Sequence, residues 1–169
     1  MMFRNSRKQT RTPFVAILAV SMSLIAAGVA MSELMQLAAC PLCVVQRMLY
    51  LLMAVLAALA IPVANWRFGR RFLATCLALT AGGGTLVAGY QAWIQRFSPM
   101  TTCSGRLSWW EEIVESAGNA VPLLFRASGL CSDPAWKFLG LSIAEWSLLA
   151  FSALLIVAIV GFRFRQSGR

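Results

Sequence analysis

Four long apolar runs limit what this chain can fold into. They cover residues 14–32, 42–64, 72–94 and 143–162; the first and third carry no charge, the second carries only Arg47, and the fourth only Glu145. A bilayer core about 30 Å thick needs roughly 20 helical residues, so each run can span it. Of the 169 residues, 12% are charged, against about a quarter in a typical soluble domain. The sequence therefore predicts an all-α integral membrane protein, with residues 1–169 forming one antiparallel four-helix transmembrane bundle.

The first run could be mistaken for a secretory signal, because basic residues precede it and small residues lie near residues 26–30. Its apolar stretch is longer than the roughly 7–15 residues typical of a signal peptide, and further spans follow. We interpret it as an uncleaved first membrane helix.

Charge is distributed unevenly along the chain, whose net charge is +9. With four spans, both termini and the turn near residues 65–71 fall on one side of the membrane. That side holds ten of the fifteen basic residues: Arg4, Arg7, Lys8, Arg11, Arg67, Arg70, Arg71, Arg163, Arg165 and Arg169. All six acids fall on the other side or at its border. The positive-inside rule predicts cytoplasmic termini and a long outer loop over residues 95–142, and it accounts for the basic excess without nucleic acid.

The chain has five cysteines and no histidine, the commonest general base and metal ligand, so any chemistry must fall to cysteine, arginine, carboxylates or a bound cofactor. Cys40, Cys43, Cys103 and Cys131 are predicted on the outer side. Outside a bacterial inner membrane the compartment is oxidising, so disulfides persist there. Cys76 is alone in the third span and is expected to be a small apolar packing residue.

Cys40 and Cys43 form a Cys-x-x-Cys motif at the outer end of the second span. A disulfide between two cysteines this close would add little stability, because the stabilisation from loop closure grows with loop length. The spacing is more useful for a disulfide that opens and closes. Zinc would need four such ligands, but Cys103 and Cys131 lack this spacing and the compartment disfavours free thiols, so we expect no metal. That loop pair could equally be a static disulfide.

Arg47 follows Cys43 by four residues, so the two side chains share one face of a helix. A charge inside a membrane span is expensive and marks a functional site by default. Its positive charge would stabilise a thiolate on Cys43. The alternative is that Arg47 only extends to the lipid headgroups, which its place near the outer end permits.

The outer loop contains a short amphipathic pattern over residues 107–115. Apolar residues at 107, 110, 113 and 114 oppose three glutamates, Glu111, Glu112 and Glu115. The pattern predicts a short helix that either lies in the membrane interface, anchored by its tryptophans, or packs on top of the bundle.

These features together resemble the disulfide bond formation protein B (DsbB) family. The resemblance covers nearly the whole chain: four spans, a Cys-x-x-Cys at the outer end of the second, an arginine one turn later and a cysteine pair in the outer loop. Local matches include Phe125-Arg-Ala-Ser-Gly-Leu-Cys131 and Trp136-Lys-Phe-Leu-Gly-Leu141, followed by Trp146.

The resemblance implies a quinone-dependent thiol–disulfide oxidoreductase of the bacterial inner membrane. It would reoxidise a soluble periplasmic DsbA-like protein of thioredoxin fold through two redox disulfides, Cys40–Cys43 and Cys103–Cys131. Cys103 would form a mixed disulfide with this partner, and Cys131 would pass the electrons to Cys40. Ubiquinone or menaquinone from the membrane pool, bound non-covalently beside Cys43 and Arg47, would regenerate the Cys40–Cys43 disulfide.

The chain departs from some relatives at two positions. They carry a glutamate before the arginine and a histidine after the third span, where this chain has Gln46 and Arg96. A proton-delivery role is therefore not carried over to these residues. Two other functions are compatible with the sequence: a non-catalytic membrane scaffold with static disulfides, and a reductase or sulfur-transfer protein with reversed electron flow.

Overall fold

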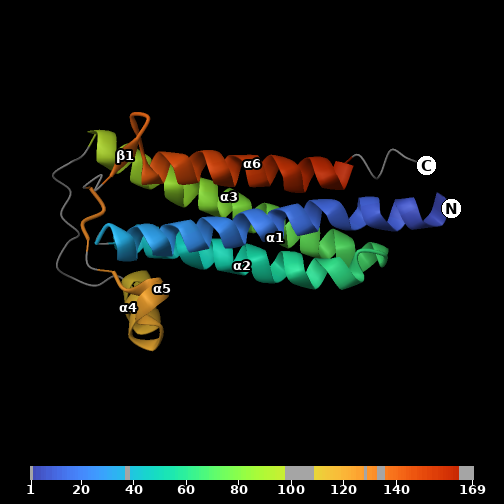
Figure 1. The fold of residues 1–169 in the computed structure, drawn as a ribbon, viewed down its shortest axis with the longest axis horizontal. Coiled ribbons are helices and arrows are strands. Elements are labelled where there is room, and N and C mark those ends of the chain that lie inside the picture. The colour runs from blue at the N-terminus through green and yellow to red at the C-terminus, as the bar shows by residue number, and fades with distance from the viewer. Residues whose placement is uncertain (1, 37–38, 98–108, 128, 133–135, 164–169) are drawn as a thin grey trace.

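Four long helices lie side by side and antiparallel in the computed structural model (Figure 1). They are α1 (Met2–Leu34), α2 (Pro41–Val63), α3 (Arg67–Phe97) and α6 (Ile143–Arg163). The structure describes residues 2–36, 39–97, 109–127, 129–132 and 136–163, with side chains omitted for 2–10 and 161–163. Each long helix contains a stretch that is long and apolar enough to cross a membrane. The prediction of an all-α four-helix membrane bundle is confirmed.

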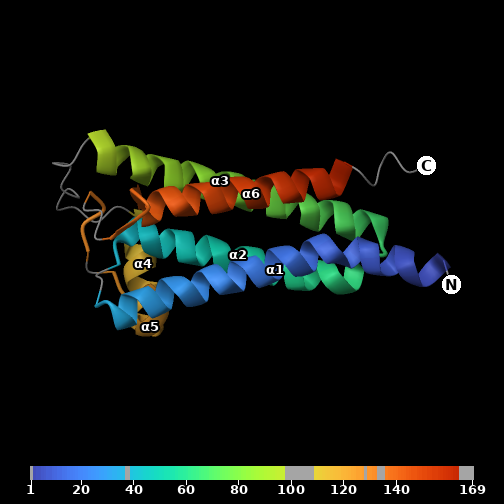
Figure 2. The same cartoon turned by 45° about the horizontal axis from the view of Figure 1, so that its top comes forward.

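The two ends of the bundle differ. The start of α1, the end of α6 and the turn from α2 to α3 lie together at one end (Figure 1). The opposite end carries the short elements α4 (Trp109–Ala120), α5 (Pro122–Phe125), β1 (Lys137–Phe138) and β2 (Leu141–Ser142). Helices α4 and α5 lie across this end beside α2, and β1 and β2 form an antiparallel hairpin before α6 (Figures 1 and 2).

The expected amphipathic helix of the loop is present as α4, within which Val114 is buried and Trp109 is exposed. Residues 107–108, where the pattern begins, lie outside the described residues. The helix α4 packs against α5 and lies beside the start of α2, at the flank of the bundle (Figure 1). Its contact with the membrane interface stays a prediction.

Local sequence signals fix where α2 and α6 begin. Pro41 occupies the first turn of α2, where its missing N–H costs nothing, and the Cys43 backbone N–H donates to the sulfur of the N-cap residue Cys40 at 3.2 Å. Before α6, the Ser142 N–H donates to Glu145 Oε2 at 2.8 Å while the Glu145 N–H donates to Ser142 Oγ at 3.4 Å. This reciprocal pair is a capping box. Glu145 also forms an ion pair with Arg96 at 2.5 Å, which ties α3 to α6.

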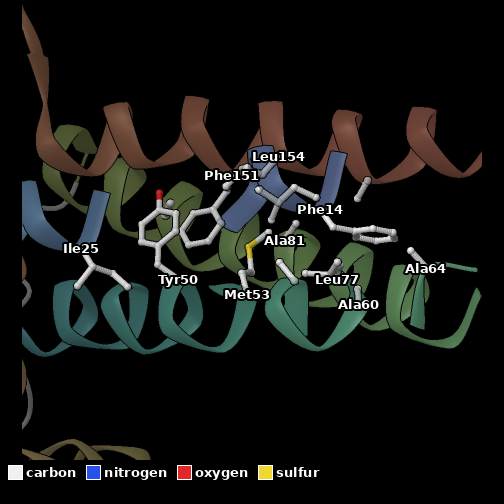
Figure 3. Packing of buried hydrophobic residues seen from close by; sticks show 14 residues of the cluster. Phe14, Ile25, Tyr50, Met53, Ala60, Ala64, Leu77, Ala81, Phe151 and Leu154 are labelled. Carbon is white, nitrogen blue, oxygen red and sulfur yellow. The ribbon is translucent and has the colours of Figure 1, made fainter. Parts of the chain in front are cut away.

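The core between the helices centres on an aromatic stack. Tyr50 of α2 and Phe151 of α6 lie face to face, with ring centroids 4.1 Å apart and planes within 2° (Figure 3). Gly84 of α3 lets the backbone reach this stack, because a Cβ there would lie 2.4 Å from the Phe151 ring. The two glycines before it differ: a Cβ on Gly82 or Gly83 would meet nothing within 4 Å.

Exposed aromatic residues mark both ends of α3. Trp66 and Phe68 lie at its start with ring centroids 5.9 Å apart, and Trp93 and Phe97 lie near its end at 6.4 Å. At 1.5 Å per residue, Trp66 and Trp93 are about 40 Å apart along the helix. That distance is close to the thickness of a bilayer with its interfaces, roughly 40–45 Å, where tryptophan is enriched.

Candidate functional site

The Cys-x-x-Cys motif stands at the bundle end that carries the short elements. Cys40 caps α2 and Cys43 lies in its first turn, so the helix start turns both sulfurs toward each other. The sulfurs are 2.6 Å apart, and Cys40 is 3% exposed. A disulfide, with its S–S bond of about 2.0 Å, therefore requires only a small movement.

Cys131 approaches the motif from the segment that follows α5. The Gly129 N–H donates to the Ala39 carbonyl at 3.0 Å, which pins this segment beside the start of α2. Cys131 is buried, and its side chain is hydrogen-bonded with that of Cys40. Three of the four predicted redox cysteines are thus brought together. The fourth, Cys103, lies outside the described residues.

The surroundings of Cys40 favour its uncharged form. The hydrogen bond with Cys131, the hydrogen bond with Cys43 and burial all raise the pKa of the Cys40 thiol, in that order of importance. In thiol–disulfide exchange the sulfur that carries charge more easily is the better leaving group. Cys40 is therefore suited to be the sulfur that is attacked, which leaves Cys43 to depart.

Two buried glutamines join the motif to α3. Gln91 is 1% exposed, and its side-chain Nε2 donates to the sulfurs of both Cys40 and Cys43, each at 3.1 Å. Gln46, 3% exposed, donates from its own Nε2 to Gln91 Oε1 at 2.7 Å. Sequence reasoning treated Gln46 only as a departure from relatives and missed Gln91. A polar residue inside an apolar span was the available signal.

Arg47 is held by oxygen atoms of two other segments. Its Nη2 donates to the Gly28 carbonyl of α1 at 2.8 Å and to the Ser32 hydroxyl. Its Nη1 donates to the Leu124 carbonyl of α5 at 3.0 Å. These three hydrogen bonds hold the guanidinium against α1 and α5, so it has partners within the protein. A Cβ at Gly28 would lie 3.4 Å from Arg47 Nε, so the glycine leaves room for the side chain.

A cavity of about 610 Å³ opens beside these residues. Cys40, Cys43, Arg47 and Gln91 line it, and most of the remaining wall is apolar. The Oε1 atom of Gln95, another lining residue, is buried and has no hydrogen-bond partner among the described residues. Small-molecule sites typically measure about 300–1,000 Å³ and combine apolar walls with a few polar groups. The cavity has these properties.

The hairpin and the start of α6 supply an aromatic wall. The rings of Trp136 and Phe138 stack with centroids 5.6 Å apart, and Phe138 meets Trp146 at 6.2 Å. Trp146 Nε1 donates to the Phe138 carbonyl at 3.2 Å, which locks the hairpin to α6. All three residues line the cavity. The sequence identified them only as part of a family pattern, without indicating that they share a site.

The remaining sequence candidates lie away from the cavity wall. Arg96, on the position where some relatives carry histidine, is occupied by its ion pair with Glu145 and is not a lining residue. Cys76 lies in the half of α3 that is remote from Gln91 and the motif. Its packing role stays a prediction.

Comparisons with known proteins agree with this arrangement. The family model of the disulfide bond formation protein DsbB matches residues 10–161. The chain belongs to the DsbB family. It is 36% identical to the disulfide bond formation protein B of Azoarcus sp. (strain BH72) over 155 residues, which cover 90% of this chain and 92% of that protein. The same protein of Nitrosomonas europaea is 37% identical over 133 residues, covering 75% and 77%.

Membership in the DsbB family combines with the four spanning helices to define the protein broadly. It is a multi-pass membrane protein of disulfide bond formation with a disulfide oxidoreductase role. The motif, Cys131 and the cavity of this DsbB-type chain lie together at one end of the bundle.

Proposed function

We propose that this protein reoxidises a periplasmic DsbA-like dithiol protein and passes the electrons through two disulfides to a membrane quinone. The observation that carries the proposal is the contact chain from Cys131 to Cys40 to Cys43, which ends at the wall of an apolar cavity. A static scaffold has no need for three sulfurs in contact beside such a cavity.

Electrons would move by successive thiol–disulfide exchange. The partner's thiolate attacks Cys103 of a Cys103–Cys131 disulfide, and resolution of this mixed disulfide oxidises the partner and leaves Cys103 and Cys131 reduced. The Cys131 thiolate then attacks Cys40, forming a Cys131–Cys40 disulfide and releasing the Cys43 thiolate. The Cys103 thiolate would resolve that disulfide by attacking Cys131, which restores Cys103–Cys131 and leaves Cys40 and Cys43 reduced. The raised pKa of Cys40 supports this order, because the sulfur that is harder to charge is the one attacked.

The residues around the cavity fit a quinone. The apolar walls and the aromatic residues Trp136 and Phe138 suit a flat hydrophobic ring, and the cavity has the volume of a small-molecule site. Arg47 offers positive charge, and Gln95 Oε1, which lacks a partner among the described residues, offers a buried acceptor for a hydroxyl of the reduced quinone. A bound quinone would accept two electrons and two protons. Arg47 would stabilise negative charge at the cavity wall, including that of a Cys43 thiolate.

The deciding experiment is quinone reduction by the purified protein supplied with a reduced thioredoxin-fold donor, followed by the loss of quinone absorbance. We expect turnover in the wild type and none in Cys43→Ser or Cys131→Ser, because each removes one link of the relay. Cys76→Ser is the matched control and should retain turnover. A wild-type protein whose disulfides stay unchanged in the presence of donor and quinone would instead be the static scaffold.

We further propose that the end carrying the motif faces the periplasm and that both termini are cytoplasmic, as the basic residues indicate. Two exposed positions test this: Leu139, 79% exposed at the hairpin, and Trp66, 63% exposed at the other end. A membrane-impermeant maleimide on intact spheroplasts should label Leu139→Cys at once. Trp66→Cys should react only after permeabilisation; the reverse pattern would invert the orientation.

A further inference from the structure

The buried amide pair Gln46–Gln91 touches the reacting sulfurs, and the relay as described so far does not use it. The side-chain Nε2 of Gln91 lies 3.1 Å from each sulfur of the motif. Both glutamines are almost fully buried, so water does not compete for these hydrogen bonds. A buried amide in a membrane helix is costly unless its polar atoms are partnered.

The pair fixes which end of the Gln91 amide faces the sulfurs. The oxygen and nitrogen ends of an amide are nearly alike in shape, and only the partners distinguish them. In the structure Gln46 donates to the Gln91 oxygen at 2.7 Å, and the Gln91 NH₂ group points to Cys40 and Cys43. An NH₂ group stabilises a thiolate, whereas an amide oxygen would repel it.

We propose that Gln91 is a catalytic residue that stabilises the Cys43 thiolate, and that Gln46 is the positioning residue that orients the Gln91 amide. The inference rests on the proposed function. In the step concerned, the Cys131 thiolate attacks Cys40, the S–S bond between Cys40 and Cys43 breaks, and the bonding electron pair leaves on Cys43. Charge moves from one sulfur to another and no proton is required. Gln91 donates a hydrogen bond to the sulfur on which the charge arrives.

A neutral amide complements the nearby cation. The hydrogen bonds of Arg47 go to oxygens of Gly28, Ser32 and Leu124, so its charge acts on the sulfur through space. Gln91 supplies direct contact. Because an amide does not release its proton near neutral pH, it stabilises the thiolate without protonating it.

The test is the alkylation rate of Cys43 in the reduced full-length protein, followed across pH by peptide mass spectrometry. Gln91→Met keeps the length of the side chain and removes the donor. Near neutral pH we expect its alkylation rate to fall several-fold. Losing a hydrogen bond to a charged group lowers the thiolate fraction about ten- to a hundredfold, and the greater nucleophilicity of the remaining thiolate offsets part of that loss. The limiting rate at high pH should not fall, because the thiolate is then fully formed in both proteins and the one without the hydrogen bond is the stronger nucleophile.

Gln46→Met should shift the profile in the same direction by a smaller factor, and it carries the test if Gln91→Met fails to fold. Thr85→Val is the matched control, since the Thr85 hydroxyl of α3 donates only to its own helix at Ala81. It should reproduce the wild-type profile. The inference would be overturned if Gln91→Met and Gln46→Met both fold and both have the alkylation profile of the wild type.

The alkylation assay requires neither donor nor quinone, so the two proposals fail separately. If the wild-type protein reduces quinone and the glutamine variants have unaltered alkylation profiles, only the proposed role of Gln91 is wrong. If the glutamine variants have altered alkylation profiles but the wild-type protein does not reduce quinone, the proposed electron route is wrong. Gln91 then has no catalytic role, although its hydrogen bond to the Cys43 sulfur is confirmed.

Discussion

Arg47 is a cation in an apolar helix, and its hydrogen-bond partners come from elements that are distant in sequence. Gly28 and Ser32 belong to α1, and Leu124 belongs to α5. A charge in a membrane helix is retained for function or paired for structure. Here the guanidinium forms part of the cavity wall. It also links the membrane helices α1 and α2 to α5. Its two roles can be separated by substitution.

Arg47→Ala should lower quinone reduction about ten- to a hundredfold, equivalent to the loss of a few kcal/mol of stabilisation. Arg47→Lys should retain part of the rate, because the charge remains while the planar fork that binds several oxygens is lost. The measurement is steady-state turnover with the quinone titrated. Arg126→Ala, at an exposed arginine of the outer segment, is the control. Unchanged turnover and apparent quinone affinity in Arg47→Ala would show that the charge has no part in the reaction.

Close contact between α3 and α6 depends on one glycine. Gly84 lies against Phe151, which in turn stacks on Tyr50 of α2, so three of the four long helices meet at this point (Figure 3). Small residues in membrane helices serve this purpose. The stack cannot simply move aside, because Phe151 is fully buried. Tyr50 also lines the cavity, so the same contact shapes the deep wall of the site.

Gly84→Ala should destabilise the bundle by about 1–3 kcal/mol, the usual cost of forcing an extra carbon into a packed core. Gly82→Ala and Gly83→Ala, where a Cβ meets nothing within 4 Å, should be neutral or more stable by up to about 1 kcal/mol through helix propensity. Thermal unfolding in detergent compares the three variants directly. Equal melting of Gly84→Ala and Gly82→Ala would mean that the contact with Phe151 does not limit stability.

Much of the architecture of the whole molecule could be predicted from the sequence, because a bilayer allows few backbone structures to span it. Without water, the backbone must satisfy its own hydrogen bonds, so a run of twenty apolar residues becomes a helix. Four such runs were predicted on this basis, and the short loop helix α4 was predicted from its amphipathic pattern. The spacing of Cys43 and Arg47 also indicated one helix face, and both residues line the cavity.

Contacts between helices were harder to predict. Gln91 reaches the motif because α3 packs beside α2, and an alternation of apolar residues does not determine which faces meet. The same applies to Gly84, whose neighbours in sequence have no packing contact. The aromatic wall of Trp136, Phe138 and Trp146 depends on the β1–β2 hairpin. Its strands have two residues each, which is too short to produce a strand pattern in the sequence.

The position of the sulfurs and the cavity at one end of the bundle has an electrical consequence. Dithiols would arrive at that end, and the protons that their oxidation releases would leave or be consumed there. Reduced quinone would depart sideways into the lipid as a neutral molecule. Moving one charge across the whole bilayer would couple the reaction to the membrane voltage by about 2.3 kcal/mol per 100 mV. With almost no charge crossing, turnover should be nearly independent of voltage, and the protein would oxidise thiols without storing energy in the proton gradient.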